Sequence, residues 1–210
     1  MVDTLKGYSF LLAGIDTGIR SSLGFVLFEV FLPRGEKLEK LLKIASKKSS
    51  KKRDLSLVLI DLLKESQFHK WFWQVYSFST EAERKGTTEH IYKVISETER
   101  ACNKKVSLFI EDFLFFNNKT IKSKASWFTV AKLQHTIGYL TGYFTAKGIS
   151  VKIVKPKTWR SLVGSFHYEL AAYLFPEAFS KRNSQADHIS SATGIALSGI
   201  LISKNLLKNR

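Results

Sequence analysis

Two apolar runs near the start of the chain predict a β-hairpin. The first run covers residues 8–15 and is followed by the turn sequence Asp-Thr-Gly at 16–18. The second covers residues 23–31 and ends before Pro33. Apolar runs of this length, separated by residues that favour turns, are typical of strands that pair with each other. We therefore predict that the first two strands of the fold are neighbours in one sheet.

The rest of the chain alternates between helical and strand patterns. Residues 34–70 contain a lysine-rich amphipathic piece, a basic loop and a stretch at 54–66 that predicts a helix capped by Asp54. Apolar spacing and the content of aromatic and β-branched residues then predict these elements in order: a strand at 71–80, a helix at 81–103, a strand at 106–116, a helix at 123–147, a strand at 149–154 and at least two more helices.

This order of elements, β-β-β-α-β-α-β-α, predicts an α/β fold in which helices flank a mixed five-stranded sheet. In the longest predicted helix, small residues recur every four positions at Gly138, Gly142 and Ala146. A smooth ridge of this kind predicts that the helix lies close against the sheet.

The composition excludes several classes of protein. The chain has 210 residues, of which 44% are apolar and 13% aromatic, so it can bury a core and is not disordered throughout. Its single cysteine, Cys102, excludes a disulfide scaffold and a cysteine-rich zinc site. The apolar stretch at 7–15 is shorter than the roughly 20 residues of a membrane span and lacks a cleavage site. We expect no membrane partner and a protein of the cytoplasm or nucleoid, or of a virus or organelle with a low-GC genome, and not a secreted one.

The charge is strongly positive and unevenly distributed. The chain has 33 Lys and Arg residues against 18 Asp and Glu, a formal net charge of +15. Residues 113–168 hold nine of these basic residues and no acidic residue, which favours contact with a polyanion, although a lysine-biased genome would also place lysines on solvated faces. The short basic run at 47–53 predicts an exposed loop that either contacts phosphates or stays solvated.

Two carboxylates interrupt otherwise apolar stretches. Asp16 ends the first predicted strand, where, taken alone, it is typical of a turn residue. Glu111 lies within the run Leu-Phe-Ile-Glu-Asp-Phe at 108–113, where a carboxylate is unfavourable unless it is paired or binds a cation. We therefore interpret Glu111 as a functional residue.

A third acidic residue, Asp187, comes just before the helical run at 189–201. Its Ser-x-x-Asp pattern also fits a helix capping box, and the adjacent His188 also fits a solvated helix position. If the last helix crosses the sheet beside the first and fourth strands, Asp16, Glu111 and Asp187 converge on one face. A carboxylate cluster of this kind binds Mg²⁺, and two such ions about 4 Å apart activate a water and stabilise the leaving oxygen of a phosphodiester.

Four short motifs resemble, in the same order, those of the RuvC-like Holliday junction resolvases, which have the RNase H-like fold. The matching segments are 14–18 with Gly24, 109–113 with Asn117, 155–164, and 185–192. The resemblance covers roughly residues 8–32 and 71–203. The resemblance implies that residues 1–210 form one RNase H-like nuclease domain, with an insertion at 34–70 that compact members of the family lack.

The resemblance implies a homodimer that binds a four-way DNA junction and cuts two strands symmetrically in DNA recombination or repair. It implies two Mg²⁺ ions per active site, with Mn²⁺ able to substitute, and makes Asp16 the ligand that bridges them. Glu111, Asp187 and His188 would complete the metal ligands and the catalytic set. The last helix of the family usually offers Asp or His followed three residues later by Asp. His188 fits this spacing, but Ser191 stands where the acid is expected, and Asp187 is the candidate to replace it.

The resemblance also implies DNA contacts around the site. The family has an aromatic loop after its second motif, so Phe113, Phe115 and Phe116 are candidates to stack on unpaired bases; otherwise they belong to the core of a long strand. The candidate phosphate contacts form two groups of basic residues: Lys119, Lys122 and Lys124, and then Lys155, Lys157 and Arg160. Trp159, between the last two of these, is interpreted as a packing residue.

These features leave three hypotheses open. The first is a metal-dependent endonuclease of the resolvase type, a hydrolase of phosphodiester bonds in DNA junctions. The second is an RNase H-like nuclease that acts on RNA or RNA–DNA hybrids. The third is a catalytically weakened protein that binds junction DNA, and Ser191 in place of an acid is its main support.

Overall fold

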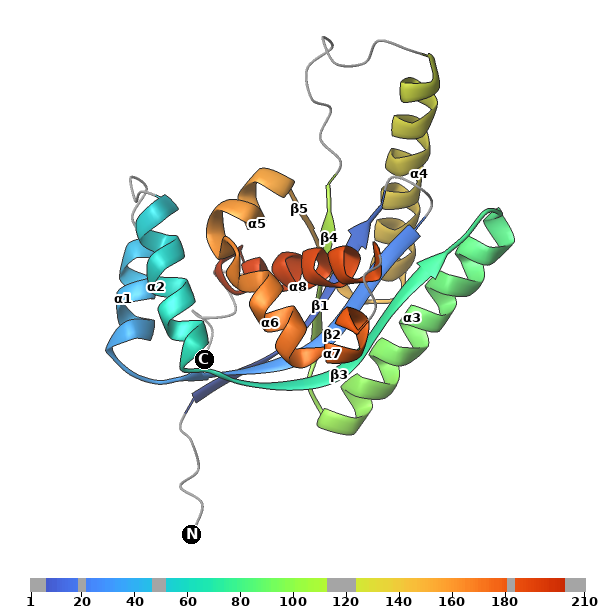
Figure 1. The fold of residues 1–210 in the computed structure, drawn as a ribbon. Coiled ribbons are helices and arrows are strands. Elements are labelled where there is room, and N and C mark those ends of the chain that lie inside the picture. The colour runs from blue at the N-terminus through green and yellow to red at the C-terminus, as the bar shows by residue number, and fades with distance from the viewer. Residues whose placement is uncertain (1–6, 19–21, 47–51, 113–123, 181–183, 203–210) are drawn as a thin grey trace.

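A mixed sheet organises the computed structural model, which describes residues 7–18, 22–46, 52–112, 124–180 and 184–202 (Figure 1). Its five strands lie in the order β3-β2-β1-β4-β5. The bounds are Gly7–Thr17 for β1, Ser22–Pro33 for β2, Gln67–Ser77 for β3, Val106–Glu111 for β4 and Ser150–Val154 for β5. Strand β2 pairs antiparallel with β1 and β3, whereas β4 pairs parallel with β1 and β5. The predicted hairpin and the mixed sheet are therefore confirmed.

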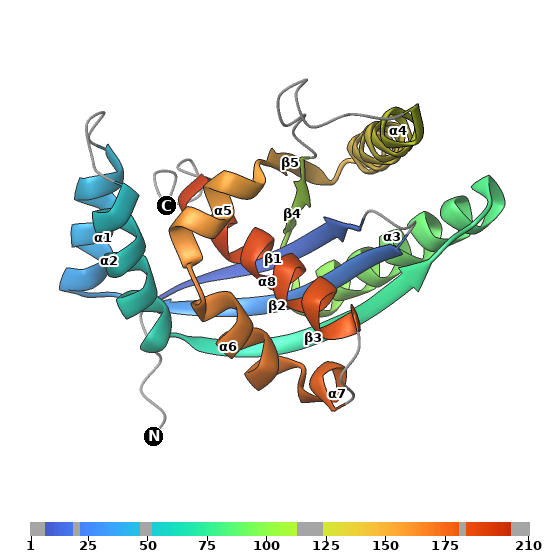
Figure 2. The same ribbon diagram turned by 45° about the horizontal axis from the view of Figure 1, so that its top comes forward.

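Helices cover both faces of this sheet (Figures 1 and 2). Their bounds are Glu36–Ser46 for α1, Lys52–Lys64 for α2, Glu81–Cys102 for α3, Lys124–Ala146 for α4, Pro156–Val163 for α5, Phe166–Leu174 for α6, Pro176–Phe179 for α7 and Ser184–Ile202 for α8. In Figure 2, α8 crosses one face of the sheet above β1 and β2, while α3 and α4 lie on the opposite side.

The two faces have separate apolar cores because side chains alternate between the faces along each strand. On one face, Leu12 and Phe28 belong to a buried cluster with residues of α1, α2, α5, α6 and α8. On the other face, Leu11 and Ile15 belong to a second cluster with residues of α3 and α4. The alternation in β1 therefore decides which helix each residue of that strand can meet.

Close packing of a helix on the sheet occurs at α8 and not at the small residues of α4. A Cβ atom added to Gly14 would lie 1.9 Å from the carbonyl oxygen of Ala192, so only glycine fits beneath α8 at this position. A Cβ atom added to Gly138 or Gly142 would meet no atom within 4 Å. The prediction that the ridge of α4 packs against the sheet is therefore wrong, because those glycines lie on the exposed side of the helix.

Element boundaries differ from the predictions in small ways. The predicted helix at 54–66 is α2, which begins two residues earlier, so Asp54 lies inside its first turn and not at its cap. A second helix, α1, accounts for the lysine-rich piece before it. The fourth strand ends at Glu111, and residues 113–116 of the longer predicted strand lie outside the described residues.

The predicted fold class, an α/β fold with a mixed five-stranded sheet flanked by helices, is confirmed. The expected neighbours β1 and β4 pair in the centre of the sheet, and the last helix crosses beside them. Within the described parts of the chain, no helix has both the length and the apolar character that crossing a membrane requires.

Candidate active site

Asp16 and Glu111 lie at the carboxyl ends of adjacent parallel strands. In the ladder between β1 and β4, Gly14 is opposite Phe109 and Ile15 is opposite Ile110, so the next position in each strand is Asp16 and Glu111. Residues two apart in a strand share a face. The two carboxylates therefore project from the face that α8 covers, since Gly14 meets Ala192 of that helix.

The two carboxyl groups are close enough to affect each other's charge. Asp16 is 8% exposed. The pKa of Glu111 is raised to about 7, first by burial and then by the negative charge of Asp16, with a hydrogen bond between the two carboxyl groups acting in the same direction. Near neutral pH Glu111 is therefore only partly ionised, and a cation bound beside it would favour its ionised form.

Two residues of α5 act against this increase in the pKa of Glu111. The indole Nε1 of Trp159 donates a hydrogen bond of 2.8 Å to Oε1 of Glu111, and the charge of Arg160 also favours the ionised carboxylate. Trp159 is 2% exposed, and its ring packs against Gly194 of α8, where an added Cβ would lie 2.7 Å from the ring. Trp159 thus packs the helix, as interpreted from the sequence, and also orients Glu111, which was not predicted.

His188 completes the described site, because both of its ring nitrogens take part in hydrogen bonds. Its Nδ1 lies 2.6 Å from Oδ2 of Asp16, and its Nε2 lies 2.9 Å from Oγ of Ser22. The hydrogen bond to Asp16 is the main cause that raises the pKa of His188, and the charges of Asp16 and Asp187 add to it. Small residues make this approach possible, because a Cβ on Gly24 would lie 2.7 Å from the carbonyl oxygen of His188.

The remaining candidates on α8 lie at the edge of this group. Asp187 is exposed in the first turn of the helix and interacts with the site through its charge on His188. Ser191 is half-buried one turn further along. Among the described residues, no group of three or more His, Cys, Asp and Glu side chains is arranged to hold a metal ion. The donors that do fit a divalent cation by their chemistry are the two carboxylates, because a cation would balance the charges that raise the pKa of Glu111.

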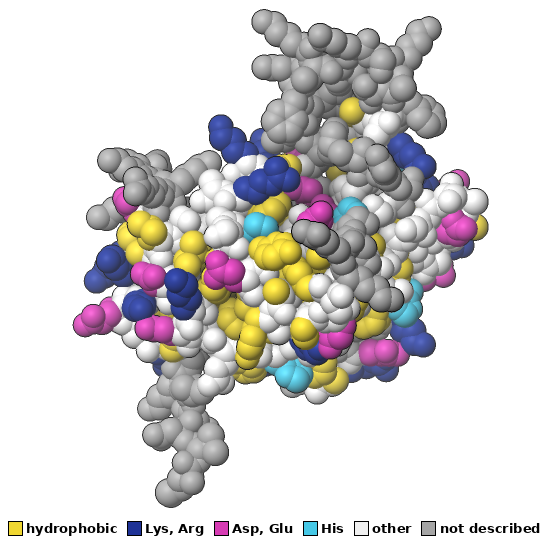
Figure 3. Space-filling view, viewed as in Figure 1, with side chains coloured by type: hydrophobic (Ala, Val, Ile, Leu, Met, Phe, Trp, Pro, Cys, Tyr) yellow, Lys and Arg dark blue, Asp and Glu magenta, His cyan; other side chains and the backbone are white. Residues whose placement is uncertain are grey.

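The basic residues of the third motif lie beside the carboxylates. Lys155 precedes α5, and Lys157 and Arg160 lie within it, all three exposed. The guanidinium of Arg160 lies 5.2 Å from the centre of the Trp159 ring. Figure 3 shows Lys and Arg side chains close to acidic and histidine side chains on this face, above the region where α5 and α8 meet.

Most of the predicted aromatic and basic loop lies outside the described residues. This applies to Phe113, Phe115, Phe116, Lys119 and Lys122. Lys124 is the first residue of α4, and its side chain is likewise outside the description.

Sequence reasoning missed two residues of the site, Trp159 and Ser22. A buried tryptophan usually has a partner for its N–H group, and this rule would have indicated a polar contact for Trp159. Ser22 is the first residue of β2, and no local sequence pattern distinguishes it from other residues at the start of a strand. Only the position of α8 brings His188 within hydrogen-bonding distance of it.

Comparison with known proteins finds similarity in structure and not in sequence. No protein-family model and no curated protein matches the chain. Among solved structures, two of RuvC from Thermus thermophilus match, one of them in complex with a Holliday junction substrate. Each is 13% identical to this chain with a TM-score of 0.49, and the match covers 93% of this chain and 96% of the RuvC chain. This similarity concerns the overall course of the backbone, and an activity has to be argued from the residues of the site.

Proposed function

We propose that this protein is a metal-dependent, structure-selective endonuclease that cleaves four-way DNA junctions. The observation that carries the proposal is the pair Asp16 and Glu111 at adjacent strand ends, where burial and mutual repulsion raise the pKa of Glu111 to about 7. Carboxyl groups held together in this way are unfavourable in a structural core. They are common where an enzyme binds a cation or moves a proton.

In this proposal, Asp16 and Glu111 bind Mg²⁺, for which Mn²⁺ can substitute, and Asp187 and His188 complete the set. The bound metal would supply Lewis-acid activation of a water molecule and stabilise charge on the leaving oxygen. The residues of the chain hold this arrangement in place: Trp159 orients Glu111 by a hydrogen bond, and Ser22 orients the ring of His188.

The proposed substrate follows from the charge around the carboxylates. Lys155, Lys157 and Arg160 are exposed on or beside α5, where they can contact the phosphates of DNA without an acidic residue nearby in the sequence. Symmetric cleavage of a junction needs two sites related by two-fold symmetry, so we propose that the active form is a homodimer.

A second candidate function is a junction-binding protein with weakened catalysis, and two observations favour it. Both ring nitrogens of His188 are engaged in hydrogen bonds, to Asp16 and to Ser22, so neither is free to bind a metal without rearrangement. Ser191 also supplies no carboxylate at the neighbouring position of α8. A protein with these features would keep the basic face and bind DNA without cutting it.

One experiment separates these functions. Synthetic four-way junctions, linear duplexes and RNA–DNA hybrids are incubated with the full chain in Mg²⁺ or Mn²⁺, and strand cleavage is measured. The variants are Asp16→Asn and Glu111→Gln. The matched controls are Asp61→Asn and Glu97→Gln, which make the same chemical changes at exposed positions of α2 and α3.

We expect symmetric cleavage of the junction by the wild type and by both controls, and no cleavage by the Asp16 or Glu111 variants. Equal cleavage by wild type and both site variants would refute the nuclease proposal. Junction binding without cleavage in either metal would establish the second candidate. Preferential cleavage of the hybrid would instead identify an RNase H-like nuclease acting on RNA.

A further inference from the structure

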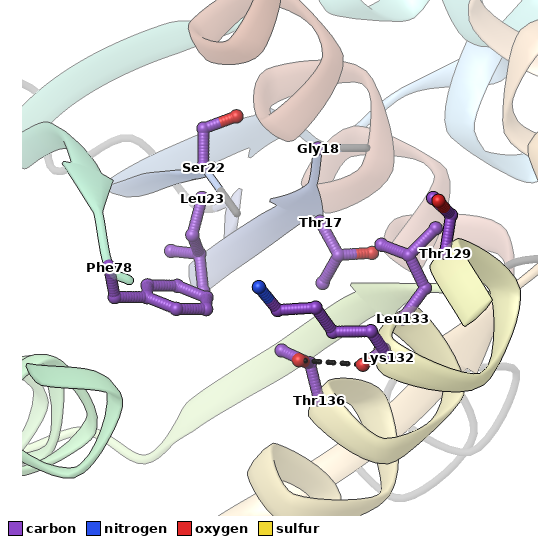
Figure 4. A pocket seen from close by; sticks show the side chains of 9 residues that line it. All are labelled: Thr17, Gly18, Ser22, Leu23, Phe78, Thr129, Lys132, Leu133 and Thr136. Atoms are coloured by element: carbon purple, nitrogen blue, oxygen red, sulfur yellow. Dashed lines mark hydrogen bonds between the residues drawn. The ribbon is translucent and has the colours of Figure 1, made fainter. Parts of the chain in front are cut away.

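A hollow opens on the opposite side of the β1 end from the carboxylates. It is shallow and open to solvent, and its enclosed part has room for about one water molecule, about 10 Å³. Its walls are the ends of β1 and β2, Phe78 beyond β3, and one side of α4 (Figure 4). The residues of α4 that face it are one turn apart, at positions 129, 132, 133 and 136, so the helix presents a continuous face to the hollow.

The polar groups of this hollow are suited to an anion. Lys132 extends across it toward Leu23 and Phe78 in Figure 4. Within the described residues, no carboxylate forms a salt bridge with Lys132, and no acidic residue lines the hollow. The ammonium group is therefore available to a ligand.

Thr17 supplies a second polar group from the sheet. The residue is 6% exposed, and its hydroxyl points toward α4 in Figure 4. No hydrogen bond joins this hydroxyl to another group in the described part of the chain. Leu23 and Phe78 form apolar walls beside it, next to the exposed side chain of Lys132.

The hollow is directly connected to the carboxylate site. Thr17 follows Asp16 in β1, so the two side chains project to opposite faces at the same strand end. Ser22 lies at the rim of the hollow, and its hydroxyl is hydrogen bonded to His188 on the carboxylate side. A ligand that follows the end of β1 would contact both.

We propose that a phosphate of the DNA strand, next to the phosphodiester that is cut, docks at the open mouth of this hollow, with the Nζ of Lys132 and the hydroxyl of Thr17 as its ligands. The inference rests on the proposed function, because it assigns the anion to the same DNA strand. Lys132 and Thr17 act as positioning residues. They hold the strand on the α4 side so that the next phosphodiester lies over Asp16 and Glu111.

The test measures binding of the full chain to a junction without metal, so that it does not depend on cleavage. Lys132→Ala is compared with Lys147→Ala, a control just beyond the C-terminal end of α4 and about 20 Å away, where the lysine lies over the rings of Tyr92 and Tyr143. We expect Lys132→Ala to lower the slope of log affinity against log salt by about 1, the value for one phosphate contact, and the control to leave the slope unchanged.

A second measurement locates the phosphate. Single uncharged methylphosphonates are placed in turn along the strand near the cleavage point. At one position the methylphosphonate should weaken DNA binding by the wild type and by Thr17→Val. The same methylphosphonate should not weaken binding by Lys132→Ala, which already lacks the contact to that phosphate. Thr17→Val keeps the shape of the side chain and removes the hydroxyl, so it should weaken binding to the native phosphate without changing the salt slope.

Two results would overturn the inference: equal salt slopes for Lys132→Ala and Lys147→Ala, or a methylphosphonate effect of the same size in Lys132→Ala and in the wild type. These outcomes are distinct from failure of the nuclease proposal. If Asp16→Asn and Glu111→Gln stop cleavage while Lys132→Ala behaves as the control, the nuclease stands and the phosphate site fails. If the carboxylate variants cut normally while Lys132→Ala loses one phosphate contact, the reverse holds.

Discussion

The two faces of the sheet differ most at the end of β1. On the α8 face, Asp16, Glu111 and His188 form a half-buried group held by hydrogen bonds, and glycines let the helix approach the sheet closely. On the α4 face, Lys132 and Thr17 line an open hollow, and the glycines of the helix face outward. Close helix packing creates the carboxylate site, whereas looser packing on the other face leaves a hollow that is open to solvent.

The largest expected effect is at the contact that brings α8 onto the sheet. In Gly14→Ala the added methyl group would overlap the carbonyl oxygen of Ala192, at 1.9 Å. We expect α8 to be displaced and the free energy of unfolding to fall by at least about 3 kcal/mol, the upper range for overpacking in a core. Urea unfolding measures this. An unchanged midpoint would show that the close contact does not hold α8 in place.

The next effect is the pH dependence of stability on the carboxylate face. The pKa of Glu111 is about 7 in the folded protein against 4.5 for a free side chain, so the folded state binds this proton more tightly than the unfolded state. The contribution of Glu111 to the free energy of unfolding is therefore fully present below pH 4.5 and is lost as the pH rises through about 7. His188 acts in the same direction, because its raised pKa gives stability that is lost at higher pH.

We expect the metal-free protein to lose up to about 3 kcal/mol of unfolding free energy between about pH 5 and pH 8. Urea titrations at each pH measure the loss. Glu111→Gln should flatten most of the profile, and Mg²⁺ should restore stability at high pH in the wild type only. A wild-type profile as flat as that of the Glu111→Gln protein would contradict the raised pKa.

A smaller effect is expected when the hydrogen bond from Trp159 to Glu111 is removed. Trp159→Phe keeps an aromatic ring against Gly194 and removes the indole donor to Glu111. Because that hydrogen bond favours the ionised carboxylate, its loss should raise the pKa of Glu111 further and cost about 1 kcal/mol of stability at neutral pH. The pH midpoint of the stability profile should move to higher pH. A midpoint that stays in place would show that Trp159 only packs the helix.

A substitution of Asp187 tests whether this exposed residue of α8 takes part in cleavage with Asp16 and Glu111. We expect Asp187→Asn to abolish cleavage and to lower stability by at most about 1 kcal/mol, the scale of a lost capping interaction. The exposure of this side chain agrees with a small effect on stability. Marked unfolding with retained cleavage would instead identify Asp187 as a capping residue.

The smallest effect is expected on the α4 face. Gly142→Ala adds a methyl group that meets no atom within 4 Å, so it should stabilise the helix by about 0.5–1 kcal/mol. Thermal unfolding of the Gly142→Ala and Gly14→Ala proteins measures the difference between the two faces. Destabilisation by Gly142→Ala would show that this side of α4 has a partner.

Much of the architecture could be predicted because it depends on local patterns. Apolar runs located all five strands, and the polar cap at Thr80 with Glu83 explains why α3 begins at Glu81. Glu111 was a candidate because a carboxylate in an apolar strand is unfavourable unless it has a function, and Asp16 joined it because the first and fourth strands were expected to be neighbours. The ridge of α4 was misjudged because small residues on a helix do not indicate which side of that helix meets the sheet.

The sequence was enough to establish the order of the elements, the pairing of the first two strands and the candidate carboxylates, because burial and strand periodicity act over a few neighbouring residues. The tertiary structure decided which of these residues meet. His188 bonds to Asp16 and to Ser22, which is 166 residues away in the chain. Trp159 reaches Glu111 across 48 residues, and Lys132 faces Thr17 from another helix. Contacts of this kind follow from how closely α8 and α4 pack on the sheet, and that closeness depends on glycines and side chains of both partners at once.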